Sequence, residues 1–338
     1  MRATPASPHF LSGRRSTMAL RGESAPRGKA AYVQLPELDG HSRKVYALGF
    51  NCDGSMLASG SNDRSIRIWD PVTERELMDL RGHSDSILSL AWDPTTPHRL
   101  ASTGSDKTVR FWDAKTGRIV NSVSLPSDAV NIAYSHDAKY VVVGNLDCIT
   151  LIDTRKARVV RRVVNPFESY EMQFSKTGFL FVAAGHAAGF GTFEIMRVVT
   201  EKKGNPNLES AHKVLAHAGS CVCLDFHPSG RYLALGGLDS LVSVWDLEEL
   251  YCVKTFVVTT SVRFSHDGKY IAIGMDDPNL VVVDVESGEK VVNLQLQNNL
   301  QYLSWHPSKN LLAYVGDKAS SDKNSNRDGV IKMIEMKE

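Results

Sequence analysis

The sequence lacks the features that mark several protein classes. No apolar run approaches the roughly 18 residues that are needed to span a bilayer, so we expect no membrane segment. Only 5 of the 338 residues are cysteines, without regular spacing, and no Asn-x-Ser/Thr glycosylation acceptor is present. This composition favours a reducing compartment over a secreted protein. The absence of a signal-peptide core near the N-terminus points the same way.

An excess of charge of either sign is also lacking, because 39 basic residues face 38 acidic ones. Residues 1–30 hold six basic residues and one acidic residue, which leaves a net charge of −4 for the other residues. A mildly acidic body argues against strong autonomous binding of nucleic acid. Residues 1–30 are rich in Pro, Ser, Gly and Arg and have no periodicity, so they are predicted to be a disordered basic tail. An organelle transit peptide is the alternative.

What the sequence does contain is a repeated unit, which is best formed at Gly40–Asp70. This stretch opens with Gly-His, closes with Trp-Asp and holds three short apolar runs that are separated by Asp, Asn and Gly turns. Such runs predict antiparallel strands. The pattern recurs about every 44 residues, and we count seven repeats. A lone predicted strand, Ala31–Leu38, precedes the first repeat.

A repeat of this length and composition resembles the WD-repeat β-propellers. The resemblance implies an all-β fold over residues 31–338, with seven four-stranded blades. The blades close into a ring because one small sheet cannot bury both of its faces. In this family each repeat supplies the outer strand of one blade and the inner three strands of the next. The strand at residues 31–38 would therefore complete the last blade and join the two ends of the chain.

Serine, histidine and aspartate recur together with tryptophan in the best-formed repeats, a composition that could suggest a hydrolase. A catalytic constellation normally occurs once, and no G-x-S-x-G nucleophile motif is present. In the WD-repeat family these residue types form a hydrogen-bond chain between the strands of a blade. We therefore interpret them as structural and expect no catalytic residue and no enzyme activity. The sets are His41, Ser59, Asp63 and Trp69; His83, Ser102, Asp106 and Trp112; and, in part, His217, Asp239 and Trp245.

A zinc site could be formed by two histidines and two cysteines that lie close together in the sequence, His217, Cys221, Cys223 and His227. None of the usual cysteine spacings is present, and His217 already belongs to a structural set. A regular strand would place both thiols on one face, and we expect small buried thiols there. The glycine-rich stretch Gly185–Gly191 has no following helix, so we interpret it as a turn and not as a phosphate-binding loop. The sequence thus predicts neither a metal nor a cofactor.

The densest basic run outside residues 1–30 consists of Arg155, Lys156, Arg158, Arg161 and Arg162. One interpretation is a solvated loop and outer strand. The other is a contact surface for an acidic partner or for an RNA backbone, which salt dependence would distinguish.

Two polar insertions, Thr200–Ser210 and Lys318–Gly329, are predicted to be irregular loops on opposite faces of the ring. Per-repeat insertions often map to a binding face, although surface drift explains them equally well.

A narrower resemblance rests on the stretches Ala129–Arg158, Leu215–Phe256 and Phe264–Asp277, which are similar to the propeller subunits of THO complexes. Repeats two to seven follow that pattern. Lys254–Val262 is shorter than in the family, so the sequence does not establish whether the outer strand of that blade forms. The resemblance implies a nuclear scaffold that binds other subunits of a THO-type complex and links transcription and mRNA processing to mRNA export. RNA would be contacted through the complex, without a small-molecule substrate. An adaptor of another nuclear complex, in splicing or chromatin, is the alternative.

Overall fold

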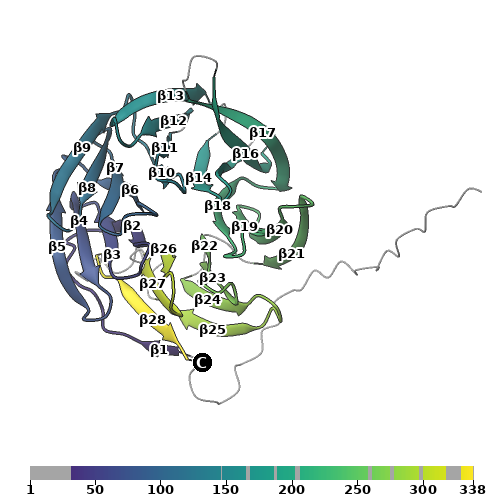
Figure 1. Cartoon of the computed structure of the whole chain (residues 1–338). Coiled ribbons are helices and arrows are strands. Elements are labelled where there is room, and N and C mark those ends of the chain that lie inside the picture. Colours follow the sequence, from purple (N-terminus) through teal and green to yellow (C-terminus); the bar gives the residue numbers. More distant parts are fainter. Residues whose placement is uncertain are drawn as a thin grey trace, which may run out of the picture.

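The computed structural model describes residues 32–337 except 146, 165–167, 186–188, 202–205, 258–260, 275–277, 297–299 and 317–328. These residues form 28 strands in seven sheets of four strands each, and the sheets are arranged as a ring (Figure 1). The predicted all-β, seven-bladed propeller is confirmed. The described residues include no helix that could cross a membrane.

The blades follow one another along the chain, and each begins at the central channel and ends at the rim. Blade 1 contains β2 (Val45–Phe50), β3 (Leu57–Ser61), β4 (Ser65–Asp70) and β5 (Arg75–Arg81), and blade 2 contains β6 (Ile87–Trp92), β7 (Arg99–Gly104), β8 (Thr108–Asp113) and β9 (Arg118–Ser124). Blade 3 contains β10 (Asn131–Tyr134), β11 (Tyr140–Gly144), β12 (Cys148–Asp153) and β13 (Arg158–Val164), and blade 4 contains β14 (Ser169–Phe174), β15 (Phe179–Gly185), β16 (Gly191–Thr200) and β17 (Pro206–His217). Blade 5 contains β18 (Cys221–Phe226), β19 (Tyr232–Gly237), β20 (Leu241–Asp246) and β21 (Tyr251–Val257), and blade 6 contains β22 (Ser261–Phe264), β23 (Tyr270–Gly274), β24 (Asn279–Asp284) and β25 (Lys290–Gln295). Blade 7 contains β26 (Leu300–Trp305), β27 (Leu311–Gly316), β28 (Lys332–Met336) and β1 (Tyr32–Gln34).

The ring is closed by a strand from the start of the described chain. Strand β1 pairs antiparallel with β28, with Gln34 opposite Ile334. The backbone N–H of Leu38 then donates to the carbonyl of Ile331 over 2.9 Å, and the Leu38 side chain is only 1% exposed. The predicted closure is thus confirmed, and β28 is not left as an open edge that another chain could pair with.

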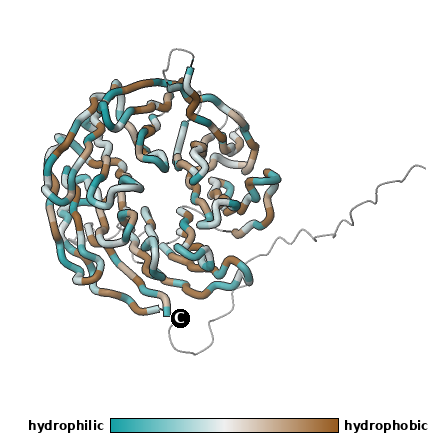
Figure 2. The backbone as a smooth tube through the Cα atoms, in the orientation of Figure 1, coloured by the Kyte–Doolittle hydropathy of each residue, from teal (hydrophilic) through white to brown (hydrophobic). Residues whose placement is uncertain are grey.

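The hydrophobic core lies between neighbouring blades. The second strand of a blade is buried along almost its whole length, as in β11 and β23, because both faces of each sheet pack against other blades. Figure 2 shows hydrophobic segments within the strands and hydrophilic segments at many of the turns. This packing makes each blade depend on its two neighbours for burial.

The aspartate of the Trp-Asp signature caps the turn between the third and fourth strands. The carboxylate of Asp70 accepts the backbone N–H of Val72 over 2.8 Å. Asp153 and Asp284 form the same kind of turn although Ile or Val replaces the tryptophan before them. The aspartate therefore acts locally, independently of the tryptophan, which explains how the turn persists in the degenerate repeats.

Three segments that were expected to be irregular or incomplete can be compared with the strands of the structure. The loop expected at Thr200–Ser210 is wrong in part, because β16 extends through Thr200 and β17 begins at Pro206. Val198 pairs with Leu208, and burial of Leu208 favours the extended hairpin over a loop. The insertion at Lys318–Gly329 lies outside the described residues apart from Gly329. The outer strand that the sequence left undecided near Lys254 is present as β21.

Candidate functional site

Blade 1 joins its strands through a chain of four side chains. The Nδ1–H of His41 donates to Asp63 over 2.8 Å, and Nε2 of the same ring accepts the hydroxyl of Ser59 over 2.7 Å. The Ser59 oxygen in turn accepts the indole N–H of Trp69 over 2.8 Å. The set therefore connects the segment before the inner strand, the second and third strands, and the turn between them.

Blade 2 repeats this arrangement with matching geometry. His83 contacts Asp106 over 2.9 Å and Ser102 over 2.8 Å, and the indole N–H of Trp112 donates to Ser102 over 2.8 Å. His83 is 6% exposed and Ser102 is fully buried. A nucleophilic serine must be reachable by substrate, and this one is covered. We therefore call these four-residue groups blade sets and keep the interpretation that they are structural.

Blade 5 holds a third blade set that the sequence showed only in part. His217 contacts Asp239 over 2.9 Å, as in the other sets, but its Nε2 contacts Ser243 over 2.7 Å. The indole N–H of Trp245 donates to the same hydroxyl over 2.7 Å. Ser243 lies on β20 directly opposite Leu235, which takes the position of the serine in blades 1 and 2. A hydroxyl from the neighbouring strand thus reaches the same point, and sequence alignment of the repeats could not show it.

Replacing Asp106 by alanine tests the structural role of the blade sets. Asp106 also accepts the backbone N–H of Ser84 and the hydroxyl of Thr108, so its loss leaves the buried His83 ring and the partly buried Thr108 hydroxyl without this acceptor. We expect the free energy of unfolding to fall by about 1–3 kcal/mol, as measured by chemical denaturation. Asp85→Ala is the control, because Asp85 is exposed and contacts only its neighbour Ser86. An equal effect of the two substitutions would contradict the structural role.

The two cysteines of β18 do not share a face, contrary to the expectation from strand alternation. A β-bulge between Cys221 and Cys223 shifts the register, so Cys221 packs between blades 4 and 5 while Cys223 packs between blades 5 and 6. Burial raises the pKa of both thiols. In the described part of the chain, no group of three His, Cys, Asp or Glu side chains is arranged to hold a metal ion.

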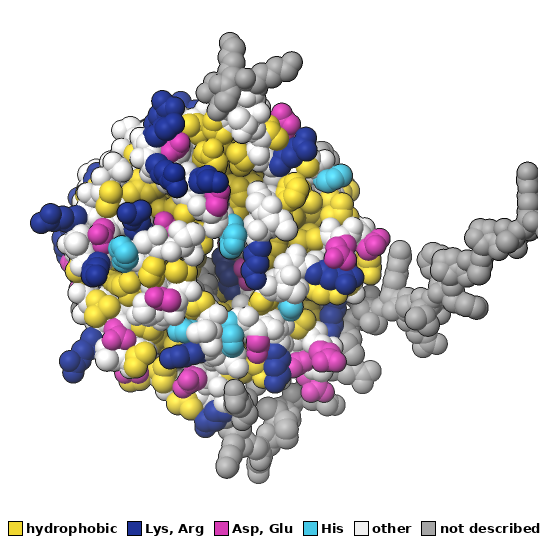
Figure 3. Space-filling view, viewed as in Figure 1, with side chains coloured by type: hydrophobic (Ala, Val, Ile, Leu, Met, Phe, Trp, Pro, Cys, Tyr) yellow, Lys and Arg dark blue, Asp and Glu magenta, His cyan; other side chains and the backbone are white. Residues whose placement is uncertain are grey.

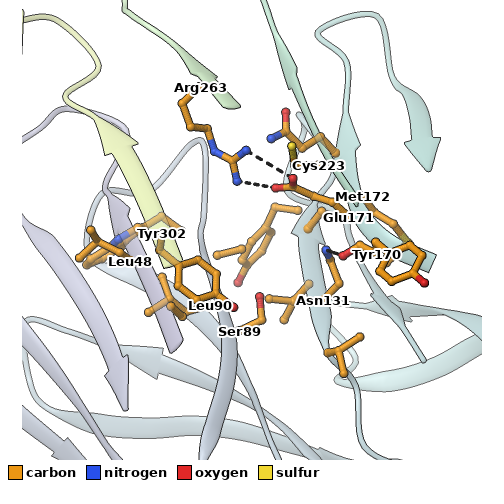
Figure 4. Close-up of a pocket in the computed structure, with 18 of the residues that line it drawn as sticks. Leu48, Ser89, Leu90, Asn131, Tyr170, Glu171, Met172, Cys223, Arg263 and Tyr302 are labelled. Atoms are coloured by element: carbon orange, nitrogen blue, oxygen red, sulfur yellow. Dashed lines mark hydrogen bonds and ion pairs between the residues drawn. The ribbon is translucent and has the colours of Figure 1, made fainter. Parts of the chain in front are cut away.

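The central channel contains a cluster of charged side chains that come from three neighbouring blades. The ring is hollowed at its centre (Figure 3), where a cavity of about 480 Å³ is lined by the innermost strands. Glu171 on β14 and Arg263 on β22 form an ion pair across this space (Figure 4). Their side chains are only 15% and 22% exposed. The pair therefore joins blades 4 and 6 past the inner strand of blade 5.

The inner strand of blade 5 contributes a second carboxylate to this cluster. Asp225 accepts the backbone N–H of Phe264 over 2.7 Å and the amide N–H of Gln173 over 3.2 Å. Burial raises the pKa of Asp225 to about 6, although the nearby Arg263 guanidinium opposes the rise. The carboxylate of Glu171 also accepts the backbone N–H of Leu224 over 2.9 Å. Because each charged member is hydrogen-bonded within the cluster, we interpret the cluster as a clasp between three blades.

Two histidines connect one blade to a turn of the next. Nε2 of His306 in blade 7 donates to the carbonyl of Gly54 in blade 1 over 3.1 Å, and its Nδ1 accepts the N–H of Ser308 over 3.1 Å. Gly54 has φ +76°, and the His306 ring occupies the space that a side chain there would need. His227 takes the same position against Gly268 of blade 6. These contacts require neutral rings, and burial lowers the pKa of both histidines.

Replacing His306 by glutamine tests this pH dependence. A histidine whose pKa is lowered by folding contributes full stability above about pH 6.5, and this contribution declines as the pH falls toward the folded-state pKa. We expect the wild-type chain to lose stability relative to His306→Gln between pH 7 and pH 5, by up to about 1.4 kcal/mol per pH unit. The readout is thermal and urea unfolding at each pH. The exposed His212→Gln variant is the control, and a stability difference independent of pH would rule out the assignment.

All five residues of the basic run are exposed at the rim. Arg155 and Lys156 lie in the turn after β12, and Arg158, Arg161 and Arg162 lie on the outer strand β13. Dark blue Lys and Arg side chains are visible over this part of the rim (Figure 3). Arg161 comes within 3.9 Å of Glu201. The sequence placed these residues on a turn and an outer strand, as observed, and their contacts remain a proposal.

Known family models match several segments of this chain, and those segments include the blade sets. The WD domain, G-beta repeat family matches residues 32–70, 74–113 and 209–246, which include all residues of the three blade sets. The WD40 domain family of anaphase-promoting complex subunit 4 matches residues 256–308. In solved structures, the Cps50 (Swd1) β-propeller domain of Myceliophteria thermophila matches 90% of this chain and 100% of its own, with a TM-score of 0.75 and 20% identity. That likeness shows the fold alone.

Similarity over most of the chain is found among curated proteins. THO complex subunit 3 of Arabidopsis thaliana is 33% identical over 307 residues, which are 88% of this chain and 94% of that protein. WD repeat-containing protein AAC3 of Dictyostelium discoideum is 28% identical over 84% of this chain and 64% of its own length. The fold and this similarity support a role as an interaction scaffold. The chain belongs to the WD-repeat β-propeller family, in the group of THO complex subunit 3.

Proposed function

We propose that this chain is a nuclear, non-enzymatic subunit of a THO-type complex that couples transcription and mRNA processing to mRNA export. The observation that carries the proposal is the similarity to THO complex subunit 3, which extends over 94% of that protein and includes blades without a blade set. Generic Trp-Asp repeats would explain similarity in blades 1, 2 and 5 only. Similarity through the degenerate blades points to a shared subunit role and not merely to a shared fold.

The physical properties of the ring suit a scaffold. Seven sheets packed against one another and closed by β1 give a stiff platform with two faces and a rim. The Ser and His side chains that could suggest catalysis are buried in the blade sets, and both channel carboxylates accept hydrogen bonds within the channel clasp. A mildly acidic body leaves RNA contact mainly to the other subunits. Docking of those subunits is therefore the activity that the architecture supports best.

Affinity purification from nuclear extract, followed by mass spectrometry, tests the proposal. The tagged full chain should recover THO-type subunits in near-stoichiometric amounts, and ribonuclease treatment should leave them bound because the contacts are between proteins. Recovery of a splicing or chromatin complex instead would favour the alternative adaptor role. Recovery that disappears with ribonuclease would overturn the idea that RNA is contacted through the complex.

The same tagged chain gives a test of location. We expect its fluorescence to accumulate in the nucleus, because the proposed partners act on nascent transcripts. A signal confined to the cytoplasm or to an organelle would contradict the proposal, and the organelle outcome would favour the transit-peptide interpretation of residues 1–30.

A further inference from the structure

A crevice opens between blades 2 and 3 and extends from the inner strand of blade 3 to the outer strand of blade 2. Its volume is about 500 Å³, and its walls include Thr96, Arg99, Val120, Tyr134 and Arg155. Thr96 lies in the first turn of blade 2, Arg99 is the first residue of β7, and Val120 lies on the outer strand β9. Tyr134 and Arg155 come from the inner strand and the last turn of blade 3. We call this site the blade 2–3 crevice. Neither the blade sets nor the channel clasp uses any of these five side chains.

Most cationic side chains of the crevice and of the adjoining rim form no ion pair among the described residues, and Arg161, which lies near Glu201, is the exception. Within the described ranges, no ion pair is formed by Arg99, Arg155, Lys156, Arg158 or Arg162. Each of these residues is exposed. Unpaired arginines that gather at a concave site present N–H donors with no internal acceptor, and arginine is well suited to bind carboxylates in a bidentate manner.

The acidic residues of the same neighbourhood are already engaged. Asp93 is 5% exposed and accepts the backbone N–H groups of Thr95 and Thr96 over 2.8 and 3.0 Å. Asp137 pairs with Lys139 over 2.7 Å. Asp153 accepts the backbone N–H of Lys156 over 2.9 Å. These carboxylates are held by backbone N–H groups of the turns and, for Asp137, by Lys139, whereas Arg99 and Arg155 form no ion pair among the described residues and can bind a ligand.

The side wall of the crevice adds a neutral donor and an apolar contact. The Tyr134 hydroxyl has no hydrogen-bond partner in the described part of the chain, and burial raises the pKa of this residue, so it stays a neutral O–H donor. Val120 on β9 is 53% exposed at the edge. Beyond the crevice, the cationic surface continues from Arg155 and Lys156 onto β13. The whole surface is thus a short pocket that leads onto a basic strip.

We propose that the blade 2–3 crevice and the basic strip of β13 form a docking site for an extended, carboxylate-rich peptide segment of another protein subunit. Acidic side chains of the segment bind Arg99 and Arg155 in the crevice, and further acidic side chains contact Arg158 and Arg162 along the strip. Aliphatic side chains of the segment pack on Val120. This inference deepens the proposed function by naming the chemistry of one partner.

Charge and shape favour this occupant over two others. The chain's own residues 1–30 hold six basic residues against one acidic residue, so they would be repelled by the site. Single-stranded RNA binds through phosphates together with base stacking on aromatic side chains. Among the described residues, the large exposed hydrophobic side chains in blades 2 and 3 are Ile119, Val120, Val130 and Val164, none of which is aromatic.

Fluorescence anisotropy with the purified full chain tests the proposal. The probe is a fluorescein-labelled peptide of alternating glutamate and valine, about eight residues long, which spans roughly 26 Å when extended. We expect saturable binding that weakens at least about tenfold in the Arg99→Gln/Arg155→Gln variant. Binding by Arg158→Gln/Arg162→Gln should weaken to a smaller extent, because these positions lie on an open strand.

The matched control is Arg75→Gln/Lys290→Gln, which removes two exposed charges from the first positions of the outer strands of blades 1 and 6. It should bind the probe like the wild type. The same peptide with glutamine in place of glutamate should not bind. Absence of binding, equal binding by all variants, or preferential capture of a labelled single-stranded RNA would each overturn the inference.

The two proposals fail separately. If the acidic peptide does not bind while nuclear purification still recovers THO-type subunits, the docking site is wrong and the proposed function stands. If the peptide binds as expected but no THO-type subunit is recovered, the proposed function is wrong and the acidic-peptide site stands. Thermal unfolding of each variant checks that the exposed substitutions leave the fold unchanged.

Discussion

Replacing Arg263 by methionine is expected to lower the free energy of unfolding by about 3–5 kcal/mol, because it removes the only cation from a largely buried group with two carboxylates. The guanidinium pairs with Glu171 and also donates to the carbonyls of Leu224 and Val262 over 3.2 and 2.7 Å. Its loss therefore removes contacts among three blades at once. Methionine keeps much of the side-chain volume, so the effect reports mainly on charge and hydrogen bonds.

The pH dependence of the Arg263→Met variant separates lost charge pairing from lost packing. The pKa of Asp225 is about 6 in the folded protein and 3.8 as its ordinary value, so ionised Asp225 disfavours folding and protonation relieves that cost as the pH falls below 6. Without the guanidinium this cost grows. We therefore expect the deficit of the variant to be larger at pH 7.5 than at pH 5.

A double variant provides the matched control for the channel clasp. Glu171→Gln/Arg263→Met removes one carboxylate together with the cation, and glutamine can still accept the N–H of Leu224. Urea denaturation should show the double variant to be more stable than Arg263→Met alone, with a coupling of about 1–3 kcal/mol. If both variants unfolded at the same urea concentration, the ion pair would have no role in joining the blades.

Deleting residues 1–39 is expected to cost at least about 5 kcal/mol of stability, since it removes β1 and the buried Leu38 together. Strand β28 would become an open edge of the last blade, with unpaired N–H and C=O groups. Such an edge can pair with that of a second copy. We therefore expect the truncated chain to unfold at a lower temperature and to form dimers or aggregates, as measured by light scattering.

Deleting residues 1–30 alone is the control, because it leaves β1 and Leu38 in place. This shorter deletion should keep the unfolding temperature of the full chain and remain monodisperse under the same conditions. A loss of stability as large as that of the longer deletion would show that ring closure at β1 is not the source of the effect.

Much of the architecture could be predicted because its signals are local and repeated. Short apolar runs between Asp, Asn and Gly turns specify strands and hairpins without reference to distant residues. The aspartate of each Trp-Asp signature caps a turn within its own hairpin, so the pattern survives in repeats that have lost the tryptophan. Recurrence of the blade sets also favours a framework role over an active site for their Ser, His and Asp residues.

The residues of the candidate sites could be predicted less completely from the sequence. Ser243 completes a blade set from the opposite strand, and only the strand register reveals this. The bulge at Cys221 and Cys223 reverses the expected direction of one thiol. The exposed basic run could be recognised because its residues are consecutive, whereas Arg99 and Tyr134 join it only where two blades meet.

The sequence by itself determined the number of blades, the position of their turns and the residues of the first two blade sets, because each depends on contacts within one repeat. The tertiary structure decided which side chains meet across repeats. Glu171, Asp225 and Arg263 lie on the inner strands of three successive blades, with Arg263 92 residues after Glu171, and only the stacking of inner strands around a closed axis places them together. The channel clasp is therefore a property of the ring and not of any single repeat.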